Sequence, residues 1–258
     1  RPGDEEIYIN LGLMDEQEEN LTGAMDHYKA ALIVQPRSAV TYNNLGGVYL
    51  KQDKAAQAEE CFKRAASLNR FLIEPRLNLA SLYWKQEKSL EAQALLEENL
   101  TIDPNEERSL FSLIRISLAR EEKTKAVDLA KRFLTRSRNP QELVSLGSLF
   151  AQYRFSNMAF SFYFKALTID PSNKNAFLEV GKLYGNIGQL QRAILFWQEG
   201  LRHHPTEKSF GELITEARRL LQEKKSHTVL GFSSQRHPPD CSGPFRSSVR
   251  IIRGGSVG

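Results

Sequence analysis

Three asparagines recur at a constant spacing of 34 residues: Asn10, Asn44 and Asn78. An asparagine side chain carries an acceptor oxygen and two donor hydrogens, so it can pair with both the N–H and the C=O of an extended peptide. Such pairing holds the peptide backbone without reading its side chains. The repetition predicts a ladder of backbone clamps. The alternative is that these are solvated residues of a repeat that has no ligand.

Large apolar residues follow the same spacing. Leu50, Trp84 and Leu118 also recur every 34 residues, and Leu77 and Phe111 could join them in an apolar strip beside the asparagines. Large aromatic side chains are the usual anchors of affinity in a binding groove. The alternative for Trp84 is that it packs into the next helical unit. The predicted peptide-binding residues, with two lysines as flanking charges, are Asn10, Asn44, Asn78, Leu77, Trp84, Phe111, Lys51 and Lys85.

The sequence contains no recognisable catalytic constellation. None of its five histidines has a Ser or Cys nucleophile in a strand-turn-helix context, and its glycines are spread singly rather than gathered in a phosphate loop. Cys61 and Cys241 lie far apart, without another Cys or His at zinc-ligand spacing. We expect no catalytic residue, no metal, no cofactor and no small-molecule substrate, and therefore a protein that is not an enzyme.

The asparagines belong to a longer internal repeat. The segments Tyr8–Gly12, Tyr42–Gly46 and Arg76–Ala80 align at intervals of 34 residues. A fixed period between 20 and 50 residues indicates stacked repeats rather than one compact core. Four of the repeating units close with a proline, at Pro36, Pro104, Pro171 and Pro205.

This pattern resembles the tetratricopeptide repeat family, whose signature is an aromatic residue, Leu-Gly, Tyr, then Ala, a second aromatic, Ala and Pro. In the second unit the signature falls on Tyr42, Leu45, Gly46, Tyr49, Ala58, Phe62 and Ala65. The resemblance implies an all-α fold, a right-handed superhelical solenoid of antiparallel helix hairpins. Six units are predicted, at 5–38, 39–72, 73–106, 107–139, 140–173 and 174–207.

Small residues explain how the two helices of a hairpin approach one another. We expect Gly12 and Gly46 to face Ala24 and Ala58 across their hairpins, with aromatic residues filling the gaps to neighbouring helices. The same arrangement is expected in the fifth and sixth units. The fourth unit departs from it, because Ile114 and Phe133 replace small residues and the unit is one residue short. We therefore predict a local irregularity at this hairpin.

The two ends of the chain differ from the repeats. Residues 1–4 are interpreted as a leader, and residues 207–224 show one apolar face at helical spacing, which predicts a capping helix with Thr206 as its N-cap. Residues 225–258 lose periodicity and predict a disordered tail. The tail holds five basic side chains and one acidic side chain, so the net charge of +4 lies there.

The resemblance also implies where a ligand binds. In this family the first helix of each unit lines the concave surface, and the residue before Leu-Gly, here Asn10, Asn44 and Asn78, points into it. This device is similar to that of the repeat domains of O-GlcNAc transferase and kinesin light chain, which bind extended peptides. The carboxylate clamp of the heat-shock co-chaperone subfamily is not expected, since its positions in the second unit hold Asn43 and Gly47.

We therefore predict a scaffold that binds an extended peptide or protein segment on the concave face of the solenoid. Two alternatives remain open: a substrate-targeting module of a larger enzyme such as a glycosyltransferase, and attachment of the basic tail to RNA or an anionic surface. Nucleic acid is the less favoured partner. No apolar run approaches the length of about 20 residues that crosses a bilayer, and no signal peptide is recognised, which favours the cytoplasm.

Overall fold

The computed structural model describes residues 4–229, which form helices joined by short turns and contain no strand. No helix within this range combines the length and the apolar character needed to cross a membrane. The expected all-α fold is confirmed. The thirteen helices of the described range are α1 (Asp4–Gln17), α2 (Leu21–Val34), α3 (Ala39–Lys51), α4 (Ala55–Leu68), α5 (Glu74–Lys85), α6 (Ser89–Ile102), α7 (Glu107–Ala119), α8 (Lys123–Arg136), α9 (Pro140–Gln152), α10 (Ser156–Ile169), α11 (Lys174–Asn186), α12 (Leu190–His203) and α13 (Lys208–Val229).

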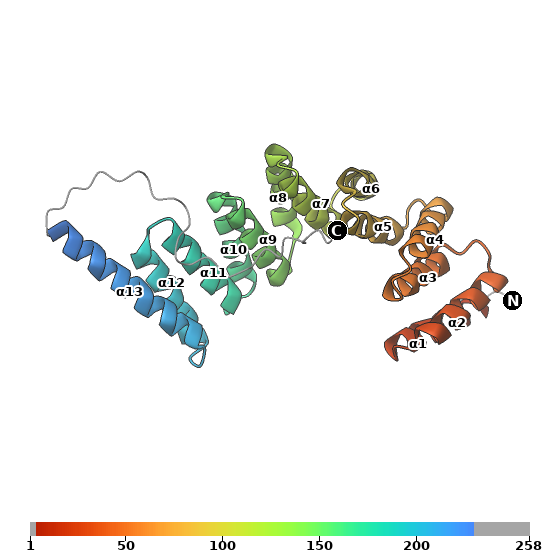
Figure 1. Cartoon of the computed structure of the whole chain (residues 1–258), viewed down its shortest axis with the longest axis horizontal. Coiled ribbons are helices and arrows are strands. Elements are labelled where there is room, and N and C mark those ends of the chain that lie inside the picture. Colours follow the sequence, from red (N-terminus) through yellow and green to blue (C-terminus); the bar gives the residue numbers. More distant parts are fainter. Residues whose placement is uncertain (1–3, 230–258) are drawn as a thin grey trace, which may run out of the picture. The chain divides into compact units, whose positions relative to one another are not determined.

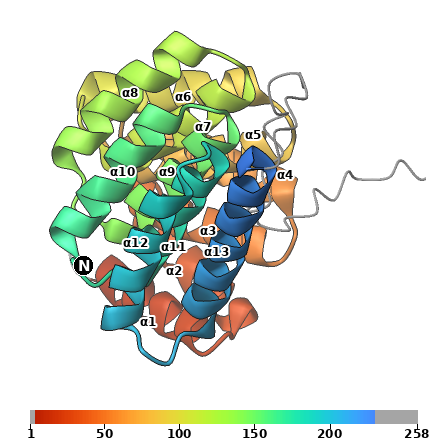
Figure 2. The same ribbon diagram turned by 90° about the vertical axis from the view of Figure 1, so that its left-hand side faces the viewer.

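The helices pair as antiparallel hairpins, with consecutive helices packed together in each pair (Figure 1). The chain divides into two compact units between Arg136 and Ser137. The first unit holds four hairpins, α1–α2 to α7–α8. The second unit holds two hairpins, α9–α10 and α11–α12, together with α13, which packs along α12 (Figure 2). The boundary lies directly after the hairpin that was predicted to be irregular, and that irregularity stays a prediction.

One backbone conformation recurs in the turn inside every hairpin. The second residue after the first helix has a positive φ, in the left-handed region that non-glycine residues rarely adopt. Five of the six are not glycine. The set is Glu19, Asp53, Glu87, Glu121 and Arg154, with φ between 58° and 65°, and Gly188, with φ of 81°. The shared conformation turns the chain back within three residues, which lets the two helices pack along their whole length.

The glycines of the first helices lie against aromatic rings, which come nearer to them than the alanines that were expected to face them. A Cβ atom added to Gly46 would lie 2.6 Å from Cε1 of Phe62, and one added to Gly12 would lie 2.5 Å from Cε1 of Tyr28. Gly147 and Gly181 meet Tyr163 and Trp197 in the same way. The physical reason is that the ring sixteen residues further on occupies the space that a side chain at the glycine would need.

In the six hairpins, the larger the residue at this position of the first helix, the smaller the residue sixteen positions later on the second helix. Where the first helix has glycine, the second has an aromatic residue. In the third hairpin Ala80 is matched by Leu96, and in the fourth the large Ile114 is matched by the small Ala130, with all four side chains buried. The fourth hairpin therefore reverses the sizes rather than adding volume, which is the kind of exchange that cores tolerate best.

A polar cluster replaces the usual apolar packing of the third hairpin. Arg76 stands at the aromatic position of the repeat and Asn99 at the second small position, and both side chains are buried. Arg76 Nε donates to Asn99 Oδ1 at 2.6 Å, and Asn99 Nδ2 donates to Ser109 Oγ at 3.2 Å. Arg76 Nη2 also donates to the carbonyl oxygen of Arg70 at 2.6 Å. The cluster ties α5, α6 and α7 together, and each buried polar group has a partner.

The last helix covers the end of the second unit. Phe210, Ile214 and Ala217 of α13 are buried in one cluster with Trp197 of α12. The helix begins after Glu207, whose carboxylate accepts from Ser209 Oγ at 2.7 Å and from Lys174 Nζ at 2.9 Å. These bonds lower the pKa of Glu207 to about 2. Glu207, rather than the expected Thr206, therefore occupies the N-cap position.

The bounds of the two ends differ from those expected. Helix α1 begins at Asp4, one residue before the predicted unit, and α13 continues to Val229, five residues beyond the predicted cap. The predicted disorder and binding role of the basic tail fall on residues of which 230–258 lie outside the described range. Both stay predictions.

Candidate functional site

The first helices of the four hairpins in the first unit form one layer, tied together by side chains. Lys51 of α3 pairs with Glu16 of α1, with Nζ 2.6 Å from Oε2. Asn78 Nδ2 of α5 donates to Asn43 Oδ1 of α3 at 3.0 Å. Arg108 of α7 forms the next tie, to Glu74 of α5. Each tie joins residues 34 or 35 positions apart, so the same surface of the layer recurs from one hairpin to the next.

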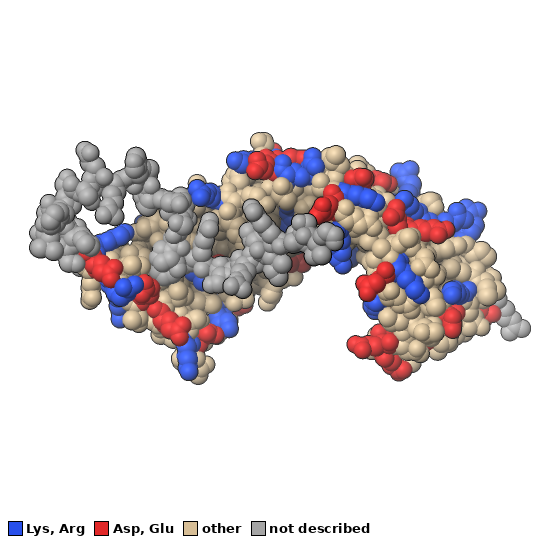
Figure 3. Space-filling view, viewed as in Figure 1, with Lys and Arg blue, Asp and Glu red and all other residues tan. Residues whose placement is uncertain are grey.

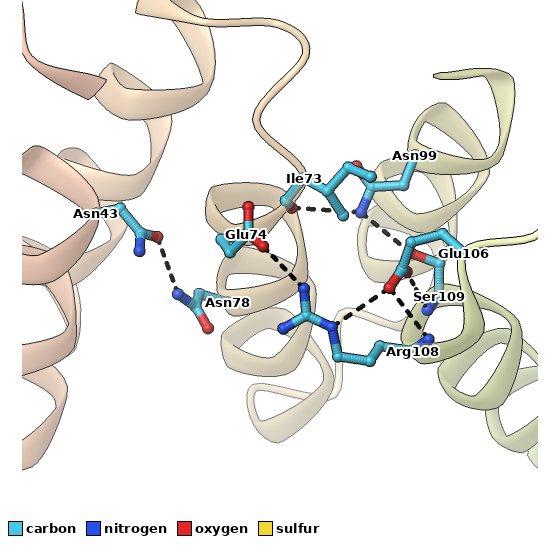
Figure 4. Close-up of polar contacts among 8 residues, drawn as sticks. All are labelled: Asn43, Ile73, Glu74, Asn78, Asn99, Glu106, Arg108 and Ser109. Carbon is cyan, nitrogen blue, oxygen red and sulfur yellow. Dashed lines mark hydrogen bonds and ion pairs between the residues drawn. The ribbon is translucent and has the colours of Figure 1, made fainter. Parts of the chain in front are cut away.

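The tie between α5 and α7 is part of a small charged network (Figure 4). Arg108 Nη2 lies 3.0 Å from Glu74 Oε1, and its Nε lies 3.3 Å from Glu106 Oε1. Glu106 also accepts from the backbone N–H of Ser109 at 2.6 Å, which caps the start of α7. Because the arginine is held by two carboxylates, its side chain is fixed at the edge of the layer.

The three asparagines of the predicted ladder have different surroundings. Asn10 is exposed on α1, and Asn44 is half-buried on α3. Neither side chain has a hydrogen-bond partner among residues 4–229. Asn78 is half-buried and spends one donor on Asn43, so Figure 4 shows these two amides pointing toward one another from neighbouring helices. The bond leaves Asn78 with its acceptor oxygen and Asn43 with its donor nitrogen.

The predicted apolar contacts lie partly at the surface. Leu77 and Trp84 on α5 and Phe111 on α7 are all half-buried. The Phe111 ring packs against Phe133 with ring centroids 6.0 Å apart, and the Arg115 guanidinium lies 5.9 Å from its centroid. Phe111 is therefore held in place from two sides.

Two further members of the series have different roles. Leu118, which follows the same spacing, is buried and cannot contact a ligand. Of the two flanking lysines, Lys85 is exposed, whereas Lys51 is engaged by Glu16.

Two hollows of the first unit are lined by residues other than Asn10, Asn44 and Asn78. The larger has a volume of about 640 Å³ and is lined mainly by α6 and α8, including Leu100, Leu129 and Arg132. Its polar edge is the ion pair of Lys125 with Glu97. Burial alone would raise the pKa of Glu97, but the hydrogen bonds from Lys125 and Gln93 outweigh it and lower that pKa. The asparagines of the row do not line this hollow.

Sequence reasoning missed the hydrogen-bond partner of Asn78. Asn43 precedes Asn44 and lies 35 residues before its partner Asn78, one position out of the repeat register. The Asn43–Asn78 bond and the Glu16–Lys51 ion pair both join residues 35 positions apart. Residues at this spacing can contact each other because the first helices of neighbouring hairpins lie side by side.

Sequence and structure comparisons agree on the class of protein. A family model of the tetratricopeptide repeat matches residues 37–105, the second and third hairpins. A search of curated proteins finds no match. The structure is similar to that solved for PilF of Pseudomonas aeruginosa, with 21% identity and a TM-score of 0.61 over 83% of this chain and 97% of that one.

Two more solved structures share the fold. A tetratricopeptide repeat protein of Parabacteroides merdae has 16% identity and a TM-score of 0.59, covering 90% of this chain and 94% of its own. YrrB, described as having an unusual peptide-binding site, has 16% identity and a TM-score of 0.54, covering 74% and 97%. The described chain has the fold of a tetratricopeptide repeat protein, and its second and third hairpins match the family in sequence.

Proposed function

We propose that the first-helix layer of the first unit binds an extended peptide segment of a partner protein. The observation that carries this proposal is the row of amides at Asn10, Asn44 and Asn78, at one register on the first helices of three successive hairpins, with Asn43 bonded to Asn78. The first two amides have no partner among residues 4–229. Tetratricopeptide repeats are generally non-catalytic scaffolds, and YrrB, which has this fold, is described as a peptide-binding protein. Both points support an interaction role.

Each amide would contribute in its own way. Asn44 offers its acceptor oxygen and its donors to one peptide unit, so it can bind that unit in a bidentate manner. The Asn43–Asn78 pair offers one acceptor and one donor from two different helices. The donor and the acceptor therefore come from α3 and α5, and the two side chains are already oriented by the 3.0 Å bond between them. Pre-orientation lowers the entropy that binding must otherwise overcome.

The half-buried apolar residues would supply affinity. Leu77 and Trp84 of α5 and Phe111 of α7 expose part of their side chains, and large side chains of this kind dominate binding energies. Backbone clamps fix the direction of the peptide, while the apolar surface selects the side chains that alternate along it.

The test replaces Asn10, Asn44 and Asn78 by alanine in one protein. Peptides selected from a random library on the wild-type chain should bind the triple variant more weakly by several kcal/mol at most, since each lost hydrogen bond is worth about 1 kcal/mol net. Thermal stability should be nearly unchanged. Titration calorimetry measures the affinity, and N-methylation of the peptide backbone should weaken wild-type binding in the same way.

A matched control removes three exposed asparagines outside the row: Asn105, Asn157 and Asn186. This variant should bind the selected peptides as the wild type does. Equal affinity of the wild type and of the Asn10, Asn44 and Asn78 triple variant would contradict the amide ladder. Binding that ignores backbone N-methylation would contradict recognition of an extended backbone.

A further inference from the structure

The fourth hairpin lacks an aromatic ring at a register where four other hairpins have one. The rings at this register of the first helices are Tyr49, Tyr83, Phe150 and Tyr184. In α7 the register falls on Ser117, 34 residues after Tyr83. Ser117 is fully buried, and its Oγ has no hydrogen-bond partner among residues 4–229. Proteins rarely leave a buried polar atom unpaired, because it costs free energy, so the missing ring coincides with an unsatisfied hydroxyl.

Other hairpins show what surrounds a ring at this register. Tyr83 OH donates to Glu59 Oε1 of the preceding second helix, α4, at 2.9 Å. The Tyr184 ring lies 4.6 Å from the Phe160 ring of the preceding second helix, α10, and 5.4 Å from the Phe196 ring of its own second helix, α12, measured between centroids. Such a ring therefore lies beside two second helices, and a tyrosine hydroxyl finds its acceptor on the preceding one.

The acceptor is kept beside Ser117, although the ring is missing. Gln93 of α6 lies 34 residues after Glu59 and so occupies the same place in the repeat. Its Nε2 donates to Glu97 Oε1 at 3.1 Å. Its Oε1 is shielded from solvent and has no hydrogen-bond partner in the part of the chain that the structure describes. An unused acceptor therefore occupies the register at which Glu59 accepts from a tyrosine.

The hollow of about 640 Å³ between α6 and α8 lies next to this place. Leu100 and Leu129 line it, together with Leu113, which precedes Ser117 by one turn of α7. Leu129 occupies the register of Phe196, which flanks the Tyr184 ring in the sixth hairpin. Figure 3 shows side chains of both charge signs close together over α6 and α8. The volume lies within the range of about 300–1,000 Å³ that is typical of ligand pockets, with apolar residues inside and charges at the edge.

We propose that this hollow binds a tyrosine side chain of a partner protein. The tyrosine ring packs between Leu100 and Leu129, in place of the ring that Ser117 does not supply. Its hydroxyl donates to Gln93 Oε1, as Tyr83 donates to Glu59, and Ser117 Oγ donates to the tyrosine oxygen. Tyrosine fits better than phenylalanine because it satisfies both unpaired atoms. The site is formed mainly by second helices, so it does not depend on the amide row of the first helices.

The experiment titrates the full chain with N-acetyltyrosinamide and follows the methyl resonances of Leu100, Leu113 and Leu129 by NMR. N-acetylphenylalaninamide and N-acetylleucinamide are the controls. The tyrosine probe should bind about fivefold more tightly than the phenylalanine probe, since one hydrogen bond is worth about 1 kcal/mol net. The leucine probe should bind more weakly still. Leucine binding as tight as tyrosine binding would overturn the proposal. Failure of the peptide Gly-Ser-Tyr-Ser-Gly to bind would also overturn it, because the hollow would then accept only a free small molecule.

Matched variants locate the site. Ser117→Tyr restores the ring of the repeat, so it should abolish binding of the tyrosine probe and raise the melting temperature measured by circular dichroism. Ser81→Tyr makes the same exchange at an exposed position of α5 and should change neither. Gln93→Leu should remove the preference for tyrosine over phenylalanine and leave binding of the phenylalanine probe unchanged. A Ser117→Tyr protein that binds the tyrosine probe as the wild type does, or that melts at a lower temperature, would overturn the proposal.

Discussion

At the residue scale, the hairpins are held by pairs of side chains whose sizes compensate. Gly46 lies under Phe62 and Gly181 under Trp197, whereas Ile114 is matched with Ala130. Each pair contains one residue from each helix of a hairpin, separated by sixteen positions. The combined size of the two residues is constrained, whereas each residue can vary if its partner compensates. This explains how the fourth hairpin can lose the family's small residue and still bury both members of the pair.

Gly46→Ala tests this compensation. The new Cβ would lie 2.6 Å from a fully buried ring that has no room to move, so we expect a loss of about 2 kcal/mol in the free energy of unfolding. Gly47→Ala is the control, because nothing lies within 4 Å of its Cβ. That change should stabilise the protein by about 0.5–1 kcal/mol through helix propensity. Urea denaturation measures both.

The double variant Gly46→Ile with Phe62→Ala reproduces the pair of the fourth hairpin. Phe62→Ala alone should cost about 3–5 kcal/mol. The double variant should be more stable than the sum of the two single changes predicts, which a double-mutant cycle reports directly. Strict additivity would show that the two positions do not share one space.

At the element scale, the turn inside each hairpin determines how the two helices meet. Glu19, Asp53, Glu87, Glu121 and Arg154 adopt the conformation that Gly188 adopts without cost. The free-energy cost of this backbone conformation is offset by the large apolar surfaces that the two helices of each hairpin bury. N-terminal caps also fix where helices begin. The side chains of Ser38, Asn139 and Asn173 accept hydrogen bonds from backbone N–H groups at the starts of α3, α9 and α11.

Glu87→Gly should relieve this strain in the third hairpin. We expect the free energy of unfolding to rise by about 0.5 kcal/mol, because the left-handed conformation costs a non-glycine residue about 1–2 kcal/mol and glycine returns part of that gain as unfolded-state entropy. Ala94→Gly, an exposed position in the middle of α6, is the control and should cost about 1 kcal/mol. Thermal melts compare the two. A destabilised Glu87→Gly protein would mean that its side chain holds the turn.

At the scale of the whole molecule, stability in a stacked fold comes from contacts between neighbours. The second unit ends in α13, whose Phe210 ring lies against Gly200 of α12, 2.4 Å from where a Cβ would be. The outer residues of α13 that the structure describes, such as Glu212 and Arg218, are exposed and polar. In the first unit, α1 instead exposes the large apolar side chains of Ile7, Leu11 and Met14.

Phe210→Ala tests how far the cap supports its neighbours. Removal of this buried ring should cost about 3–5 kcal/mol locally and expose the end of the last hairpin. Hydrogen exchange should then become faster in α11, α12 and α13, while the amides of α1 to α4 keep their rates. Ile187→Ala, an exposed apolar position of the same unit, is the control and should leave exchange unchanged. Faster exchange across the entire chain would contradict nearest-neighbour stabilisation.

The sequence by itself determined the repeat, the helical hairpins and the absence of strands from the described range. A period of 34 residues with small and large residues at fixed places can be satisfied only by stacked hairpins. It also indicated the register of the asparagines. These are local or periodic features, and a single unit contains nearly all the information they need.

Only the tertiary structure decided which side chains meet. It gave the glycines aromatic partners, it joined Asn78 to Asn43, and it buried Arg76 with Asn99 from another helix. It also showed that Leu45 and Val48 of α3 are covered, whereas Leu11 and Met14 at the equivalent positions of α1 are exposed. The physical reason is that a repeat pattern is the same at every position along the stack, whereas burial depends on whether a neighbouring hairpin is there.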